Sequence, residues 1–164
     1  MFLLKVVSSI KGLPNKSAIY CLICGKGKNS ILYVGQTDNL RRRIGQHLVN
    51  RDSSVTMEGS PVKIDPSHVE KVEWWEQSDF SDSAIRGAAE IVAFDILNPR
   101  LRSGSNGSKD ATKLSKNEVF YNKMKIFFTG TPSGRMNVMT IEGLIERLLI
   151  LEDRVATLEK HKEK

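Results

Sequence analysis

The sequence predicts an α+β fold: a small three-stranded antiparallel sheet flanked by helices, with a coiled-coil-like helix at the C-terminus. Three observations support this prediction. Two runs of β-forming residues are separated by a glycine-containing turn. Segments with apolar residues at helical spacing follow them, each preceded by a residue that can cap a helix. The C-terminal segment carries a heptad repeat of apolar residues.

The predicted sheet begins with a hairpin. Residues 17–24 are rich in β-forming side chains, residues 25–30 have the composition of a turn, and residues 31–35 form a second short run. A strand follows these glycines, whereas a phosphate-binding loop would require a helix, so the turn interpretation is favoured. Residues 68–77 contain enough β-forming side chains to predict a third strand.

The first predicted helix follows the hairpin. Thr37 or Asp38 can cap it, and it runs over residues 39–48. Residues 50–67 contain Asp, Ser, Gly and two prolines, which predicts a long surface loop. The apolar face of the helix is formed by Leu40, Ile44 and Leu48.

The second predicted helix begins at Ser81 or Asp82 and continues to about Leu97. The pair Asn98 and Pro99 ends it, because the residue before a proline disfavours helical backbone angles. We expect a loop over residues 100–116, and residues 117–128 favour a helix over a strand.

The C-terminal segment is predicted to be a separate element. Residues 1–129 are expected to form one domain with a C-terminal extension, residues 130–139 a linker, and residues 140–164 a terminal helix. Apolar residues recur along this helix with β-branched side chains at two of the three a positions and leucine at each d position, which favours a parallel pair. The repeat consists of Ile141, Leu144, Leu148, Leu151, Val155 and Leu158.

Charged residues flank this repeat with complementary signs. Arg147 and Arg154 at g positions would face Glu152 and Glu159 at e positions of a second copy, which supports a homodimer through residues 141–158. The alternative is a helix docked on its own domain, because further apolar residues widen the stripe. These are Ile145, Leu149 and Ile150.

The composition of the 164 residues excludes several classes of protein. With 40% hydrophobic residues the chain can bury a core, and its apolar runs are too short to span a membrane. Cys21 and Cys24 are too few for a disulfide framework and leave a zinc site short of ligands. Lys5 interrupts the apolar start, so we expect no secretory leader and a cytoplasmic protein. A net charge of +6 favours a polyanionic partner.

One acidic residue stands out in the second helix. Glu90 lies in an apolar segment, where an unpaired carboxylate is costly to bury. One interpretation is an intrahelical pair with Arg86, although arginine four residues ahead of glutamate is the less favourable orientation. The other is a metal ligand, because a bound cation would offset the cost of burial.

Further candidates lie on the first helix and on the hairpin. Arg43 and His47 are one turn apart at the edge of the apolar face, whereas Arg42 points the opposite way. A guanidinium at the margin of a core can bind a phosphate through two parallel hydrogen bonds, although a structural salt bridge and a half-buried imidazole are the simpler interpretations. For Tyr20 and Tyr33, on adjacent strands, the simpler interpretation is cross-strand packing.

Together these residues resemble the GIY-YIG endonuclease family over about residues 17–106. The resemblance rests on Ala18-Ile19-Tyr20, on Tyr33-Val34-Gly35, and on Arg43, His47 and Glu90, which follow in the family's order. Ala18 stands where the family has glycine, a change of one methyl group. The family often carries an asparagine after the glutamate, and Asn106 is preferred here because Asn98 ends the helix.

The resemblance implies that residues 1–129 contain a nuclease domain that hydrolyses DNA phosphodiester bonds by in-line attack of water, with one divalent cation, Mg²⁺ or another such as Mn²⁺. Glu90 would be the metal ligand, and Arg43 would neutralise the phosphate oxygens. Tyr20 would take the proton from the attacking water. Tyr33 and His47 would position the reacting groups or relay this proton. Ionising a phenol at pH 7 costs about 4 kcal/mol, so Arg43 and the cation must lower the pKa of Tyr20.

DNA would be held by basic side chains outside this centre. Each of them singly is a solvated surface charge, and together they could contact phosphates. Two alternatives remain: a catalytically weak or inactive GIY-YIG-fold module that binds DNA, and an interaction protein organised by the terminal helix. The candidate DNA contacts are Lys26, Lys28, Arg41, Arg42, Arg100, Arg102, Lys109, Lys113 and Lys116.

Overall fold

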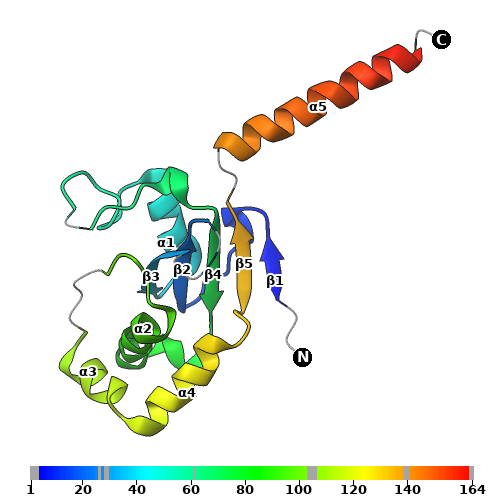
Figure 1. Cartoon of the computed structure of the whole chain (residues 1–164). Helices are drawn as coiled ribbons and strands as arrows, with labels where there is room; N and C mark the ends of the chain where they lie inside the picture. Colours follow the sequence, from blue (N-terminus) through cyan, green and yellow to red (C-terminus); the bar gives the residue numbers. More distant parts are fainter. Residues whose placement is uncertain are drawn as a thin grey trace.

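The computed structural model describes residues 4–25, 27, 30–60, 62–102, 107–138 and 141–162 of the chain. Within these residues, five strands form one mixed sheet in the order β1-β5-β4-β2-β3 (Figure 1). β1 runs parallel to β5, and the other neighbouring pairs are antiparallel. The strands are β1 (Lys5–Val7), β2 (Ala18–Ile23), β3 (Ile31–Thr37), β4 (Lys71–Trp75) and β5 (Gly134–Asn137).

Helices and short helical turns connect and cover these strands (Figure 1). α2 and α4 pack on one face of the sheet, and α1 packs on the other. These elements are η1 (Ile10–Gly12), α1 (Leu40–Gly45), η2 (Gln46–Asn50), η3 (Pro66–His68), η4 (Ser78–Ser81), α2 (Ser83–Leu97), α3 (Lys109–Ser115), α4 (Glu118–Thr129) and α5 (Ile141–Lys162).

The α+β class is confirmed, but the predicted number of three strands is wrong. The strands β2 and β4 occur within the segments that the sequence predicts, and β3 begins at the predicted residue 31 but continues beyond residue 35 to Thr37. β5 lies inside residues 130–139, which were predicted to be a linker, and it brings β1 into the sheet. Strands of three or four residues are too short to show a period of two, so their composition alone does not reveal them.

A close backbone approach allows β5 to join the sheet. Gly134 lies opposite Trp74 of β4, and a Cβ atom at position 134 would come 2.1 Å from Cζ2 of the indole ring. Because Gly134 has no side chain, β5 can pass over the indole ring of Trp74. Arg135 and Glu73 form an ion pair between the same two strands.

The central strand β2 is buried on both faces. Tyr20 and Leu22 join the core under α1, whereas Ile19 and Cys21 join the core under α2 and α4. Every residue of this strand is buried, which matches its continuous run of apolar side chains. The sheet therefore separates two cores, and side chains at its β3 edge can meet across it.

The first predicted helix differs from the structure at both ends. Asn39, instead of Thr37 or Asp38, is the N-cap, and its side chain accepts a hydrogen bond from the backbone N–H of Arg42. After Gly45 the helix widens into the π-helical turn η2, which carries His47. A π-helical turn depends on local packing and leaves no signature in apolar spacing.

The segment over residues 50–67 is only partly the predicted surface loop. Val55 and Ile64 are buried in the same core as α1, and the backbone N–H of Ile64 donates to the carbonyl of Val55. Ser53 is also buried. The first half of this segment therefore folds back under η2.

The second predicted helix is confirmed as α2. Asp82 caps it by accepting hydrogen bonds from the backbone N–H groups of Ala84 and Ile85. Asn98 ends it in the left-handed conformation with φ 44°. The predicted loop over residues 100–116 instead contains the short helix α3, and the helix expected over residues 117–128 is confirmed as α4.

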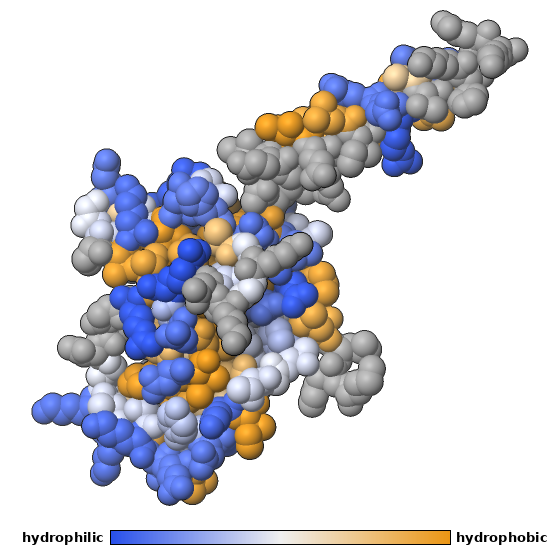
Figure 2. All heavy atoms as spheres, in the orientation of Figure 1, coloured by the Kyte–Doolittle hydropathy of each residue, from blue (hydrophilic) through white to orange (hydrophobic). Residues whose placement is uncertain are grey.

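The terminal helix α5 projects away from the sheet and its helices (Figure 1). Hydrophobic side chains on its described part face solvent (Figure 2). Leu148, Leu151, Val155 and Leu158 are each more than half exposed. Among the described residues, no helix combines the length and the apolar character needed to cross a lipid bilayer.

Candidate active site

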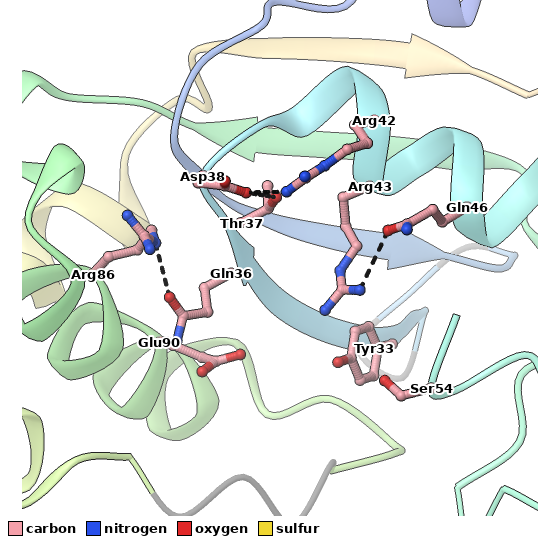
Figure 3. A pocket seen from close by; sticks show the side chains of 10 residues that line it. All are labelled: Tyr33, Gln36, Thr37, Asp38, Arg42, Arg43, Gln46, Ser54, Arg86 and Glu90. Atoms are coloured by element: carbon pink, nitrogen blue, oxygen red, sulfur yellow. Dashed lines mark hydrogen bonds and ion pairs between the residues drawn. The ribbon is translucent and has the colours of Figure 1, made fainter. Parts of the chain in front are cut away.

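A polar pocket of about 490 Å³ opens beside strand β3 (Figure 3). Because β3 is an edge strand, side chains from both faces of the sheet can reach this opening. Tyr33 approaches from the face covered by α1, and Gln36 approaches from the face covered by α2. The pocket is lined by Tyr33, Gln36, Thr37, Asp38, Arg42, Arg43, Gln46, Ser54, Arg86 and Glu90.

Glu90 supplies the acidic group of the pocket. It lies in the middle of α2 and is only 6% exposed. Burial raises the pKa of its carboxyl group from 4.5 to about 7, although hydrogen bonds from the side chain and backbone of Gln36 and the charges of Arg43 and Arg86 act in the opposite direction. The carboxylate is therefore held next to positive charge and remains costly to ionise.

Gln36 and Arg86 form the support for this carboxylate. Arg86 Nε donates to Gln36 Oε1 at 2.9 Å, and Arg86 Nη1 donates to the carbonyl of Phe80 at 2.6 Å. Because the amide oxygen of Gln36 is engaged by Arg86, its amide N–H groups are turned toward Glu90 (Figure 3). Arg86 thus acts on Glu90 largely through Gln36, a different arrangement from the simple intrahelical pair considered from the sequence.

Arg43 supplies the basic group on the opposite wall. It comes from α1, and its Nη1 lies 3.5 Å from Gln46 Oε1 (Figure 3). Its charge influences the pKa values of Tyr20, His47 and Glu90, which places all three close to the guanidinium. Arg42 also lines the pocket, where its Nη2 pairs with Asp38 Oδ1 at 2.6 Å.

The two tyrosines and His47 form one aromatic cluster behind Arg43. The ring centroids of Tyr20 and Tyr33 are 6.3 Å apart, and His47 lies 5.6 Å from Tyr20 and 6.0 Å from Tyr33. Gly35 pairs with Tyr20 across the hairpin, and a Cβ atom there would lie 2.5 Å from Tyr20 Oη. The space for both rings therefore depends on glycine at position 35.

His47 is buried and takes part in a chain of short hydrogen bonds. Its Nε2 lies 2.6 Å from Tyr20 Oη, and its Nδ1 lies 2.7 Å from Ser53 Oγ. Ser53 Oγ in turn lies 2.7 Å from Thr56 Oγ1. Burial, with a smaller contribution from Arg43, lowers the pKa of His47 to about 3, so its imidazole is neutral near pH 7.

The two phenols differ in access to the pocket. Tyr33 lines the pocket, whereas Tyr20 has no exposed surface. Burial, followed by the charge of Tyr33, raises the pKa of Tyr20 well above its ordinary value, although Arg43 lowers it as expected. The lowering of the Tyr20 pKa by Arg43 agrees with the sequence-based expectation, whereas the larger cost of burial follows only from the fold.

The predicted catalytic residues come together with one omission. Tyr20, Tyr33, Arg43, His47 and Glu90 lie at or directly behind one pocket. Asn106 lies outside the described residues. Asn98 caps the C-terminus of α2, and its Oδ1 accepts a hydrogen bond from Arg102.

The predicted DNA contacts fall into different surroundings. Lys26 and Lys28 lie outside the described residues. Arg41 is half-buried instead of exposed, because its Nε donates to the carbonyl of Leu13 at 2.8 Å. Arg102 is exposed and lies against the C-terminus of α2. The other exposed predicted contacts are Arg42, Arg100, Lys109, Lys113 and Lys116.

The lysines of α3 belong to an element that lies beside the site. Ala111 of this helix packs against Gly87 of α2. A Cβ atom built at Gly87 would be 3.1 Å from Ala111 Cβ and 3.8 Å from Gln36 Nε2. α3 is therefore placed next to the Gln36 side of the pocket. Its lysines are exposed on a helix that packs on α2, and none of them lines the pocket.

Several pocket residues were not identified from the sequence. Gln36, Gln46 and Ser54 are single polar residues without a spacing pattern, so only the fold brings them to the pocket. Gln36 follows the Tyr33-Val34-Gly35 segment by one residue, and this proximity is the single signal that could have suggested it.

Comparison with known protein families matches residues 16–82 to the GIY-YIG catalytic domain. The matched segment contains the hairpin, α1, η2 and β4, and it ends at the cap of α2. Glu90 therefore lies just beyond it. No curated protein and no solved structure matches the chain.

Proposed function

We propose, from the match of residues 16–82 to the GIY-YIG catalytic domain, that the pocket beside β3 hydrolyses DNA phosphodiester bonds with one divalent cation. The observation that supports the proposal is the convergence of Glu90, Arg43 and Tyr33 on this pocket from three elements. A buried carboxylate, a guanidinium and a phenol together can hold a cation, a phosphate and a water molecule.

The residues of the pocket fit a single hard cation. Glu90 has the oxygen ligands that Mg²⁺ prefers, and a nearby cation would favour its charged form against the cost of burial. In the described part of the chain, no group of three or more His, Cys, Asp or Glu side chains could hold a metal by itself. One carboxylate with water and phosphate oxygens is the usual arrangement for Mg²⁺, and Mn²⁺ accepts the same ligands. When bound, such a cation supplies Lewis-acid stabilisation of the leaving oxygen.

Arg43 is the proposed phosphate ligand of the chain. Its guanidinium can donate two parallel hydrogen bonds to phosphate oxygens, and the partly enclosed wall strengthens this interaction. Gln36 and Arg86 hold Glu90 on the opposite wall, so that the carboxylate and the guanidinium face one another across the pocket (Figure 3).

Tyr33 is the phenol that we place against the attacking water. It lines the pocket, whereas Tyr20 is fully buried and lies between His47 and Arg43. We therefore assign to Tyr20 a supporting position behind the pocket instead of direct contact with water. DNA would cross the pocket near the exposed lysines of α3 and near Arg42.

A homodimer through α5 is the second part of the proposal. Among the described side chains of this helix, four on a and d positions of the heptad repeat are exposed, and Ile145 and Leu149 are exposed outside these positions. A lone amphipathic helix is marginal in water, so a partner is needed to cover this seam. Two copies would bring two nuclease domains together, and such a pair could cut both DNA strands.

The nuclease proposal is tested with supercoiled plasmid DNA and Mg²⁺. Wild-type protein is expected to nick or linearise the plasmid, and Glu90→Gln is expected to lower the rate at least about a hundredfold. Asp95→Asn is the matched control, because Asp95 is an exposed acid on the same helix. It should cleave at the wild-type rate.

Two results would contradict the proposal. Cleavage by Glu90→Gln at the wild-type rate would remove Glu90 from the chemistry. Salt-sensitive DNA binding without cleavage by wild-type protein would favour a DNA-binding module with the same fold.

A further inference from the structure

The segment after η2 encloses the buried nitrogen of His47. The backbone N–H of Asp52 donates to the carbonyl of Gln46 at 3.3 Å, which turns the chain back under the π-helical turn. Val55, 2% exposed, anchors the segment in the same core as Tyr20. Ser53 is consequently held against His47 Nδ1 with only 2% of its own surface exposed.

The backbone determines the direction of the hydrogen bonds in this segment. The backbone N–H of Ser53 donates to Thr56 Oγ1 at 3.1 Å, so this oxygen is an acceptor. The Thr56 hydroxyl then has two acceptors within reach, Ser53 Oγ at 2.7 Å and the Ser53 carbonyl at 3.4 Å. The carbonyl already accepts from the backbone N–H groups of Thr56 and Met57, both at 3.0 Å. The shorter distance and the occupied carbonyl therefore favour donation of the Thr56 hydroxyl proton to Ser53 Oγ.

This direction continues to the imidazole ring. Because Ser53 Oγ accepts from Thr56, its own proton is left to donate to His47 Nδ1. An Nδ1 atom that accepts a hydrogen bond carries no proton, so the neutral ring carries its proton on Nε2. His47 Nε2 then donates to Tyr20 Oη, which also accepts a hydrogen bond from Arg43.

We propose that Ser53 and Thr56 are positioning residues that hold His47 in its Nε2–H tautomer, so that His47 and Arg43 both donate to Tyr20 Oη. The hydroxyl pair thereby supports the guanidinium that we assign to the scissile phosphate. The catalytic consequence rests on the proposed nuclease function, whereas the tautomer itself does not depend on it.

The tautomer is measured by ¹⁵N NMR of the imidazole nitrogens in the full-length protein. The chain has three histidines, and a His47→Gln spectrum identifies the signals of His47. In wild-type protein, Nδ1 is expected to show the shift of an unprotonated nitrogen and Nε2 that of a protonated one. Ser53→Ala should move the proton to Nδ1 or distribute it over both nitrogens.

The same variants are assayed on plasmid DNA. Ser53→Ala and Thr56→Val are expected to lower kcat at least about tenfold with KM unchanged, because His47 and Tyr20 lose their orientation while the DNA contacts remain. Thr56→Ser should restore the wild-type tautomer and kcat, since it keeps the hydroxyl. Ser67→Ala is the matched control, because Ser67 is an exposed serine that donates to Asp65 and takes no part in this chain of bonds.

The outcomes separate this proposal from the proposed function. A protonated Nδ1 in wild-type protein would overturn it, as would an unchanged tautomer in both Ser53→Ala and Thr56→Val. A changed tautomer with wild-type kcat would overturn the positioning role. If wild-type protein does not cleave DNA, the nuclease proposal fails, and the nitrogen shifts still decide whether Ser53 and Thr56 set the tautomer.

Discussion

At position 35 the backbone passes so close to two tyrosine rings that no side chain fits. In a Gly35→Ala variant, the added Cβ would lie 2.5 Å from Tyr20 Oη and 2.8 Å from Tyr33 Cε1. We expect the free energy of unfolding to fall by about 1–3 kcal/mol, the usual cost of overpacking a core. The plasmid cleavage rate should fall as well, since both phenols must move. Urea denaturation and the cleavage assay measure the two effects.

Gly45→Ala is the control for this substitution. Gly45 is in α1, and no heavy atom outside its local helix lies within 4 Å of a Cβ atom built there. Alanine has the higher helix propensity, so this variant should keep or raise the stability by up to about 1 kcal/mol. Equal stability of the two variants would show that the rings move aside freely.

Glu90 makes the stability of the metal-free protein depend on pH. Burial raises its pKa from 4.5 to about 7, so the folded state binds this proton more tightly than the unfolded state. The resulting stabilisation is fully present below pH 4.5 and is lost as the pH rises through about 7. Relative to Glu90→Gln, wild-type protein should lose about 3 kcal/mol of unfolding free energy across this range.

Urea denaturation between pH 5 and pH 8, with a chelator present, measures this difference. His47 makes the unfolding free energy change with pH in the opposite direction. Its pKa is lowered in the folded state, so its contribution to stability is lost as the pH falls. Since both proteins contain His47, the difference between them reports on Glu90. Parallel curves for wild-type protein and Glu90→Gln would mean that the carboxylate is ionised at no cost.

The helix α2 presents Glu90 to the pocket. Its N-cap Asp82 accepts from two backbone N–H groups. Asp82→Ala should therefore lower the unfolding free energy by about 1 kcal/mol. Asp79→Ala is the control, because Asp79 is an exposed acid whose ion pair with Lys123 lies at the surface. A drop of equal size in both variants would exclude a specific capping role.

The elements that the sequence predicted are those with a local signal. α2 has a capping aspartate, apolar spacing and a terminating Asn-Pro pair, and the hairpin has two β-rich runs around a turn. β1, β5 and α3 have three to seven residues each and obtain most of their stabilisation from neighbouring elements. Their sequences alone therefore did not reveal them.

The exposed apolar seam of α5 predicts that the protein is a dimer. Full-length protein should sediment as a dimer, and a chain ending at Val138 should sediment as a monomer. The end point must follow β5, because ending at Gly134 would remove a strand that pairs with both β1 and β4. A monomeric full-length protein at all concentrations would contradict the proposed homodimer.

Two substitutions on α5 refine this test. Leu151 occupies a d position, so Leu151→Glu should dissociate the dimer by placing charges at the centre of the seam. Leu149 is equally exposed but lies outside the a and d positions, so Leu149→Glu should remain dimeric. Dissociation by both variants would indicate an interface broader than a two-helix seam.

Helix caps and apolar spacing are local features, and they predicted the class of fold and the principal helices. The order of five residues along the chain identified the candidate site residues Tyr20, Tyr33, Arg43, His47 and Glu90. The fold is needed to show that Tyr33 and not Tyr20 faces the pocket, that Gln36 holds Glu90, and that Ser53 joins His47 to Thr56. Burial and hydrogen-bond direction depend on residues far apart in the chain, and no spacing along one segment records them.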